Sequence, residues 1–177
     1  MLVEGISRRQ LQAAAIETLR AADTLAADRV FEPRDWPTKP DLFPVLLVQA
    51  PRDRKKGLLP GQLQFDTTIT LVVVGRVWGT DPDAINESLD VLAAQIENAL
   101  MLTEGFALAI QQFVTIETQS VVSAEGKQQI GELGMTFELE VYQAFGPEGV
   151  PLTNVTGTLT PAAGAQSIIF QSESTAG

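Results

Sequence analysis

Three glutamates on one segment, Glu132, Glu138 and Glu140, come closest in type and spacing to a chemical site. Clustered carboxylates can bind a hard cation, and a pair can act as general acid and base in glycoside hydrolysis. No Asp-x-Asp type of loop accompanies them, so we interpret them as the solvated or subunit-facing surface of a strand. An enzyme that works with acids alone stays as an alternative.

The composition excludes most other chemistry. The 177 residues include no histidine and no cysteine, which rules out a Ser-His-Asp triad, a thiolate nucleophile, a zinc finger and a disulfide. The glycines match neither a Gly-x-Gly-x-x-Gly nor a Walker pattern. We therefore predict a protein that is not an enzyme and that has no catalytic, cofactor-binding or metal-binding residues.

The charge balance also narrows the partners. There are 22 acids and 12 bases, which gives a net charge of −10 at pH 7. An acidic chain is a poor candidate for a dedicated nucleic-acid binder or for a protein anchored on an anionic membrane. No apolar run reaches the roughly 18 residues of a spanning helix. The N-terminal residues lack the pattern of a secretory signal, and missing cysteine fits a reducing cytoplasm.

Four cations gather in residues 51–62, which we expect to form a loop. They could be solvated, contact an acidic protein surface or contact a DNA backbone, and the strongly negative remainder of the chain argues against DNA. We propose them as interaction residues: Arg52, Arg54, Lys55 and Lys56.

Aromatic residues supply a second set of candidates. Phe31 and Trp36 can pin the proline-rich loop 31–42, or form a contact between subunits. Trp78 lies on a strand face that would need a second cover if helices cover only the other face. A small-ligand module with a pocket lined by Trp36 or Trp78 stays as a further alternative.

Periodicity and caps predict the elements that position these residues. The expected order is α-β-β-α-β-β, which packs most economically as an α+β fold with an antiparallel four-stranded sheet and two helices on it. The expected segments are a helix over 7–29, a strand over 43–50, a strand over 63–78, a helix from Asp81-Pro82 to near Gly105, and strands over 113–123 and 129–144.

The composition changes at Gly146-Pro147, so we divide the chain into a domain over 1–145 and an arm over 146–177. The arm is rich in Gly, Pro, Ser and Thr and is too small for a core of its own. It still holds two β-capable pieces and an apolar run, which suggests an extended arm that binds by strand addition. The candidate contacts in that run are Ile168, Ile169 and Phe170.

Six segments carry a family pattern. The first half contains Ile16-Glu-Thr-Leu-Arg-Ala-Ala-Asp-Thr-Leu-Ala, Val30-Phe-Glu-Pro-Arg-Asp-Trp-Pro-Thr-Lys-Pro and Phe43-Pro-Val-Leu-Leu-Val. The second half contains Gln64-Phe-Asp-Thr-Thr, Gln95-Ile-Glu-Asn-Ala-Leu and Ile130-Gly-Glu-Leu-Gly-Met-Thr-Phe. Over about residues 5–145 the chain resembles the tail-terminator (tail-completion) proteins of long-tailed bacteriophages, most of all those of Mu-like phages and prophages with non-contractile tails.

The resemblance implies a structural protein of the virion, assembled in the host cytoplasm. Such a protein forms a homo-oligomeric ring, usually a hexamer, at the head-proximal end of the tail. The ring stops polymerisation of the major tail tube protein and presents a surface to the head-completion proteins, while DNA only passes through its channel. A head-completion (stopper or adaptor) protein of the head-tail connector is the alternative within the same class.

Overall fold

The computed structural model describes residues 2–33, 42–125, 128–146, 154–159 and 168–173. Its contacts group Val3–Phe145 as one compact unit, and Gly146–Gly177 belong to a second. The larger unit contains, in chain order, β1 (Leu2–Glu4), α1 (Arg8–Ala21), β2 (Val30–Phe31), β3 (Val45–Gly57), β4 (Gln64–Gly79), α2 (Pro82–Leu102), α3 (Glu104–Ala107), β5 (Gln112–Glu125) and β6 (Gln128–Gly146).

One sheet holds all the strands of the larger unit. Its order is β1-β6-β4-β3-β2, and β5 also pairs with β6. The four long strands β3, β4, β6 and β5 pair antiparallel, within the expected α+β class. The expectation of a purely antiparallel four-stranded sheet is wrong, because β1 and β2 bring the sheet to six strands and β2 pairs parallel to β3. Strands of two and three residues are too short to show alternation.

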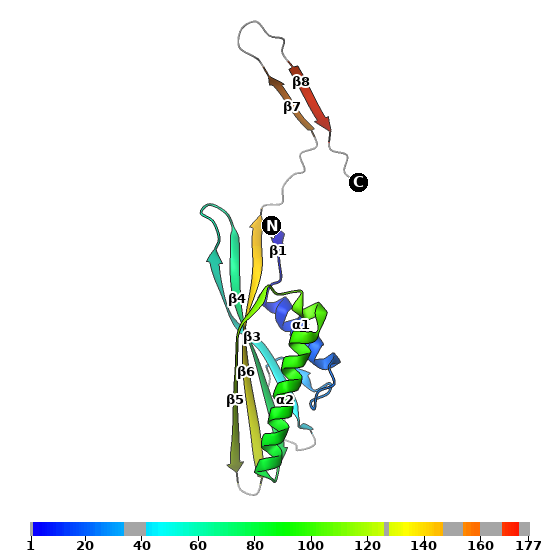
Figure 1. The fold of residues 1–177 in the computed structure, drawn as a ribbon, viewed down its shortest axis with the longest axis vertical. Helices are drawn as coiled ribbons and strands as arrows, with labels where there is room; N and C mark the ends of the chain where they lie inside the picture. The colour runs from blue at the N-terminus through cyan, green and yellow to red at the C-terminus, as the bar shows by residue number, and fades with distance from the viewer. Residues whose placement is uncertain (1, 34–41, 126–127, 147–153, 160–167, 174–177) are drawn as a thin grey trace. The chain divides into compact units, whose positions relative to one another are not determined.

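Both long helices lie on the same side of the sheet (Figure 1). α1 begins at a capping box, in which the Ser7 hydroxyl accepts from the Gln10 backbone N–H and the Gln10 side chain accepts from the Ser7 N–H. α2 begins at Asp81, whose carboxylate accepts from the N–H of Asp83, with proline at the first helical position. Both predicted starts are confirmed.

The core lies between the helices and the covered sheet face. Along β4 and β6, buried residues alternate with half-buried ones, as expected where helices cover one face only. α2 lies close to the sheet because Gly131 on β6 has no side chain, and a Cβ there would be 2.4 Å from the Cγ2 of Ile85. Helix α2 buries one stripe with the spacing of an amphipathic helix, and its residues are Ile85, Leu89, Leu92, Ile96, Ala99 and Leu100.

Three predicted boundaries are wrong. The first helix ends at Ala21 rather than 29, because Ala22 is extended and Ala27 has a φ of 51°. The second helix ends at Leu102, and the short α3 follows. The loop expected at 51–62 starts only after Gly57, because β3 continues through the basic residues with β4 as its partner.

The second unit contains a β-hairpin. β7 (Asn154–Leu159) pairs antiparallel with β8 (Ile168–Glu173), with Leu159 opposite Ile168. The two β-capable pieces expected in the arm therefore pair with each other.

Candidate interaction surface

A β-bulge in β3 decides which way its basic side chains face. The pairing with β4 shifts register between Gln49 and Arg52, and Pro51, which has no N–H to donate, lies within the irregular stretch. Val48 and Ala50 belong to the core, and uninterrupted alternation would turn Arg52 inward as well. The bulge instead places three cations opposite outward-facing positions of β4, on the sheet face away from the helices: Arg52, Arg54 and Lys56.

Two rows of residues on this outer face each have a cation on β3 and an acid on β6. The rows cross β3, β4 and β6, and they are Arg52–Thr70–Glu138 and Arg54–Thr68–Glu140. In the first row the Nη2 of Arg52 lies 3.5 Å from the Oε1 of Glu138. The Arg52 side chain is 71% exposed, and an ion pair in that setting contributes only about 0–1 kcal/mol. The charged rows therefore add little to folding and leave a patterned surface for a partner.

Lys55 differs from its basic neighbours because it faces the helix side. Its Nζ donates to the Oδ2 of Asp53 at 2.6 Å and to the Oε1 of Gln143 at 2.7 Å. The hydroxyl of Thr67 donates to the same Gln143 oxygen, and the Gln143 amide donates to the backbone carbonyl of Ile6. The hydrogen bond from Lys55 is the main cause that lowers the pKa of Asp53. Lys55 thus holds β3 to the body of the sheet.

The connection between β3 and β4 is a tight turn. The N–H of Gln62 bonds to the carbonyl of Leu59 at 3.3 Å, Pro60 follows Leu59, and Gly61 has a φ of 77°. Proline followed by a glycine of positive φ matches a type II turn. The turn presents apolar side chains to solvent, and we call residues 58–63 the hairpin tip. Its exposed leucines are Leu58 at 41%, Leu59 at 56% and Leu63 at 58%.

The leucines of the hairpin tip were missed as candidates from the sequence. Their signal was present, because three leucines stand among Pro and Gly in a segment that would otherwise be a polar turn. Every residue from 51 to 63 is exposed, so this hairpin end projects beyond the core. It combines apolar and basic groups in one place.

The aromatic candidates do not join this surface. Trp78 lies on the same sheet face, half-buried, and its buried Nε1 has no hydrogen-bond partner within the described part of the chain. Trp78 and Thr68 are ten residues apart on β4, which is roughly 33 Å along a strand. Phe31 is half-buried in β2, and Trp36 lies outside the described residues. The apolar run Ile168, Ile169 and Phe170 lies in β8 of the second unit.

The three glutamates on β6, Glu132, Glu138 and Glu140, have separate partners. Glu132 accepts from Arg76, with its Oε2 2.6 Å from the Nη2, and Glu138 pairs with Arg52. Glu140 accepts from the side-chain amide of Gln112. Among the described residues, no group of three acids is placed to hold a metal ion. The described helices include none long and apolar enough to cross a membrane.

Comparison with known proteins gives a structural neighbour but no family. No family model matches the chain, and no curated protein matches it. One similar solved structure is a chain described as "Virion of native gene transfer agent (GTA) particle". The identity is 14% and the TM-score 0.42, over 73% of this chain and 94% of that chain. The resemblance to tail-terminator proteins remains one of sequence pattern.

Proposed function

We propose that this chain is a structural protein of a phage-like virion that forms a ring at the head-proximal end of the tail tube. The ring ends polymerisation of the tube protein and provides the joining surface for the head-completion proteins. Its action is geometric, because a closed ring presents one face to the tube and a different face to the connector. In this proposal no bond is made or broken, and no cofactor takes part.

The observation that carries the proposal is the projecting end of the β3–β4 hairpin. Residues 51–63 are all exposed and place cations and leucines beyond the core of their own chain. Exposed apolar groups beside charges are typical of surfaces that bind other proteins. The six sequence segments that resemble tail terminators supply the identity of those proteins.

Two further features agree with this role. Cations of β3 and acids of β6 form two ordered rows across the outer face of the sheet, and the long helices that the structure describes lie on the other face. Each copy therefore has a helical and a non-helical face to present. The net charge of −10 would keep DNA from binding tightly as it passes through a channel.

Incubation of the purified protein with isolated tail tubes and, separately, with filled heads tests the proposal. We expect electron micrographs to show the protein at one end of the tubes, and tubes bearing it should not elongate when tube protein is added. Binding to filled heads but not to tubes would favour the head-completion alternative. Binding to neither would contradict both.

A further inference from the structure

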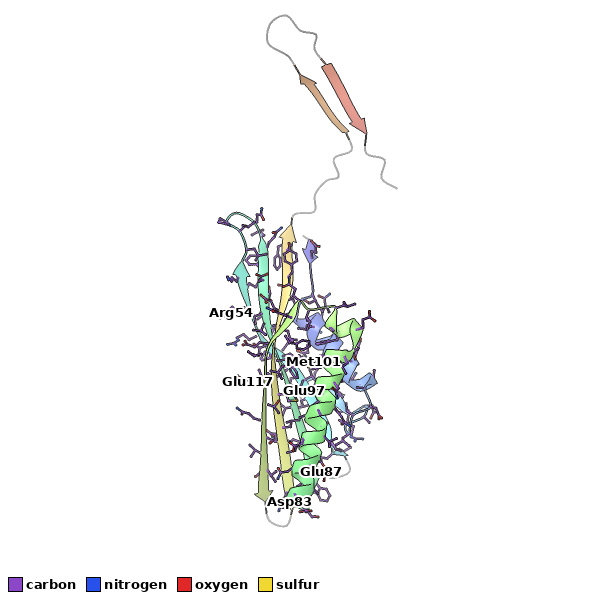
Figure 2. All side chains as sticks on the ribbon, viewed as in Figure 1. Arg54, Asp83, Glu87, Glu97, Met101 and Glu117 are labelled. Carbon is purple, nitrogen blue, oxygen red and sulfur yellow. The ribbon has the colours of Figure 1, made fainter. Side chains whose placement is uncertain are left out.

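The exposed side of α2 is acidic and partly apolar. Helix α2 contains four acids and no base, and Figure 2 shows Asp83, Glu87, Glu97 and Met101 along its length. Glu97 and Met101 are four residues apart, which makes them neighbours on a helix. Apolar side chains are exposed from the middle of the helix to its end, with Val91 at 42%, Met101 at 43% and Leu102 at 78%.

This surface is the complement of the hairpin end of β3 and β4. One side offers Arg54 and Lys56 beside the leucines of the hairpin tip, and the other offers Asp90 and Glu97 beside exposed apolar residues. Opposite charges steer two surfaces together and fix their register, while apolar contact supplies affinity. Pro60 fixes one backbone dihedral of the turn that holds the leucines, so less entropy is lost on binding.

A chain cannot make this contact with itself. Arg54 lies opposite Thr68 on the outer face of the sheet. Helix α2 packs on the other face, where its Ile85 lies against Gly131 of β6. Figure 2 shows Arg54 on one side of the sheet and the labelled residues of α2 on the other. The two surfaces can therefore meet only between copies.

Three arginines near α1 are bonded to backbone carbonyls. Arg8 donates to Ala50, Arg20 donates to Val30, and Arg29 donates to Pro44, at 2.6 to 2.7 Å for the closest atoms of each pair. These contacts fasten α1 and its following turns to the sheet. These three side chains are therefore already engaged within their own chain, whereas Arg54 and Lys56 on the outer face of the hairpin stem are exposed.

We infer that the hairpin tip and the stem cations Arg54 and Lys56 of one copy dock on the exposed side of α2 of a second copy. The two surfaces differ, so the contact is head-to-tail, and its repetition closes a ring or builds a filament. The inference rests on the proposed function in one respect, because a ring requires such a repeating contact.

A charge-swap experiment on the full chain tests the contact. One variant carries Arg54→Glu and Lys56→Glu, and the other carries Asp90→Lys and Glu97→Lys. Each variant alone should associate at least about tenfold more weakly than wild type in sedimentation velocity, because like charges then face each other. Mixing the two variants should restore association, since each altered surface meets its altered complement. The control Arg9→Glu, on the exposed side of α1, should leave association unchanged.

Cross-linking gives a second readout in a chain without cysteine. A Leu59→Cys variant and a Met101→Cys variant, mixed and oxidised, should form the mixed dimer in preference to either homodimer. Circular dichroism checks that each variant is folded. The inference is overturned if the wild-type protein does not associate. It is also overturned if the charge-reversal variants associate as well as wild type, or if mixing the two variants does not restore association. Association of purified copies is measured separately from tube capping. Association without capping would contradict only the proposed function. Capping without this contact would contradict only the inference.

Discussion

The Nζ of Lys55 lies 2.7 Å from the Oε1 of Gln143, a residue that is only 3% exposed. Thr67, which is fully buried, donates to the same oxygen. These polar groups lie on the helix-side face of the sheet near the base of the hairpin. At that place hydrogen bonds, and not apolar packing, hold the strands in position. The position of the projecting hairpin therefore depends on a small polar network.

Replacement of Lys55 by Met should destabilise the protein by about 1 kcal/mol, because it removes a hydrogen bond to a buried amide oxygen. The matched control is Lys56→Met, since Lys56 is exposed on the outer face and should change stability by less than about 0.5 kcal/mol. Urea unfolding measures both. Equal effects of the two substitutions would contradict the role assigned to Lys55.

The carboxyl group of Asp53 should titrate below its ordinary pKa of 3.8, because the hydrogen bond from Lys55 favours the charged form. A folded-state pKa below the unfolded value gives stability that is present above about pH 4 and is lost as the pH falls through the folded-state pKa. NMR titration of this side chain measures the midpoint. In Lys55→Met the midpoint should rise, and an unchanged midpoint would show that Lys55 is not the cause.

Gly131→Ala should destabilise the protein by about 1–3 kcal/mol, because the added Cβ would overlap Ile85 and Leu89 and push α2 from the sheet. Gly134 is the control on the same strand, since a Cβ there meets no atom within 4 Å. Gly134→Ala should be neutral or slightly stabilising. Thermal unfolding compares the two, and a similar loss in both would mean that close packing of α2 is not the reason.

Removal of the residues after Gly146 should leave a folded domain that docks more weakly on tails. Every buried residue that the structure describes lies between Leu11 and Gln143. Phe145 must be kept, because its ring packs edge-to-face on Phe65 at 5.8 Å and its N–H bonds to the carbonyl of Leu63. Circular dichroism and tail binding measure the two effects. Loss of folding in the truncated chain would show that the arm belongs to the core.

Much of the fold could be predicted because local signals agree with long-range packing. Short stretches of sequence are enough to predict the caps at Ser7 and Asp81, the apolar stripe of α2 and the alternation of β4. The bulges are not, because a bulge depends on the partner strand. In β5 a register shift between Phe113 and Thr115 leaves Val114 45% exposed, although regular alternation would place it on the same face as Ile116.

The candidate surface was predictable only in part. The four cations of 52–56 were recognised as a group, but the sequence could not show that the bulge at Pro51 turns Lys55 to the helix side and the other three to the outer face. The hairpin tip and the acidic side of α2 can be recognised as complementary surfaces only from the folded structure, which places them on different faces of the sheet. Complementarity of this kind is a property of tertiary structure.

Tail length in particles that lack this chain is the most direct measurement of the central claim, that copies of the protein join to end the tail tube. We predict tubes of irregular and excessive length that do not attach to heads, with normal length and attachment restored by the wild-type chain. Tubes of normal length that attach to heads without the protein would contradict the account.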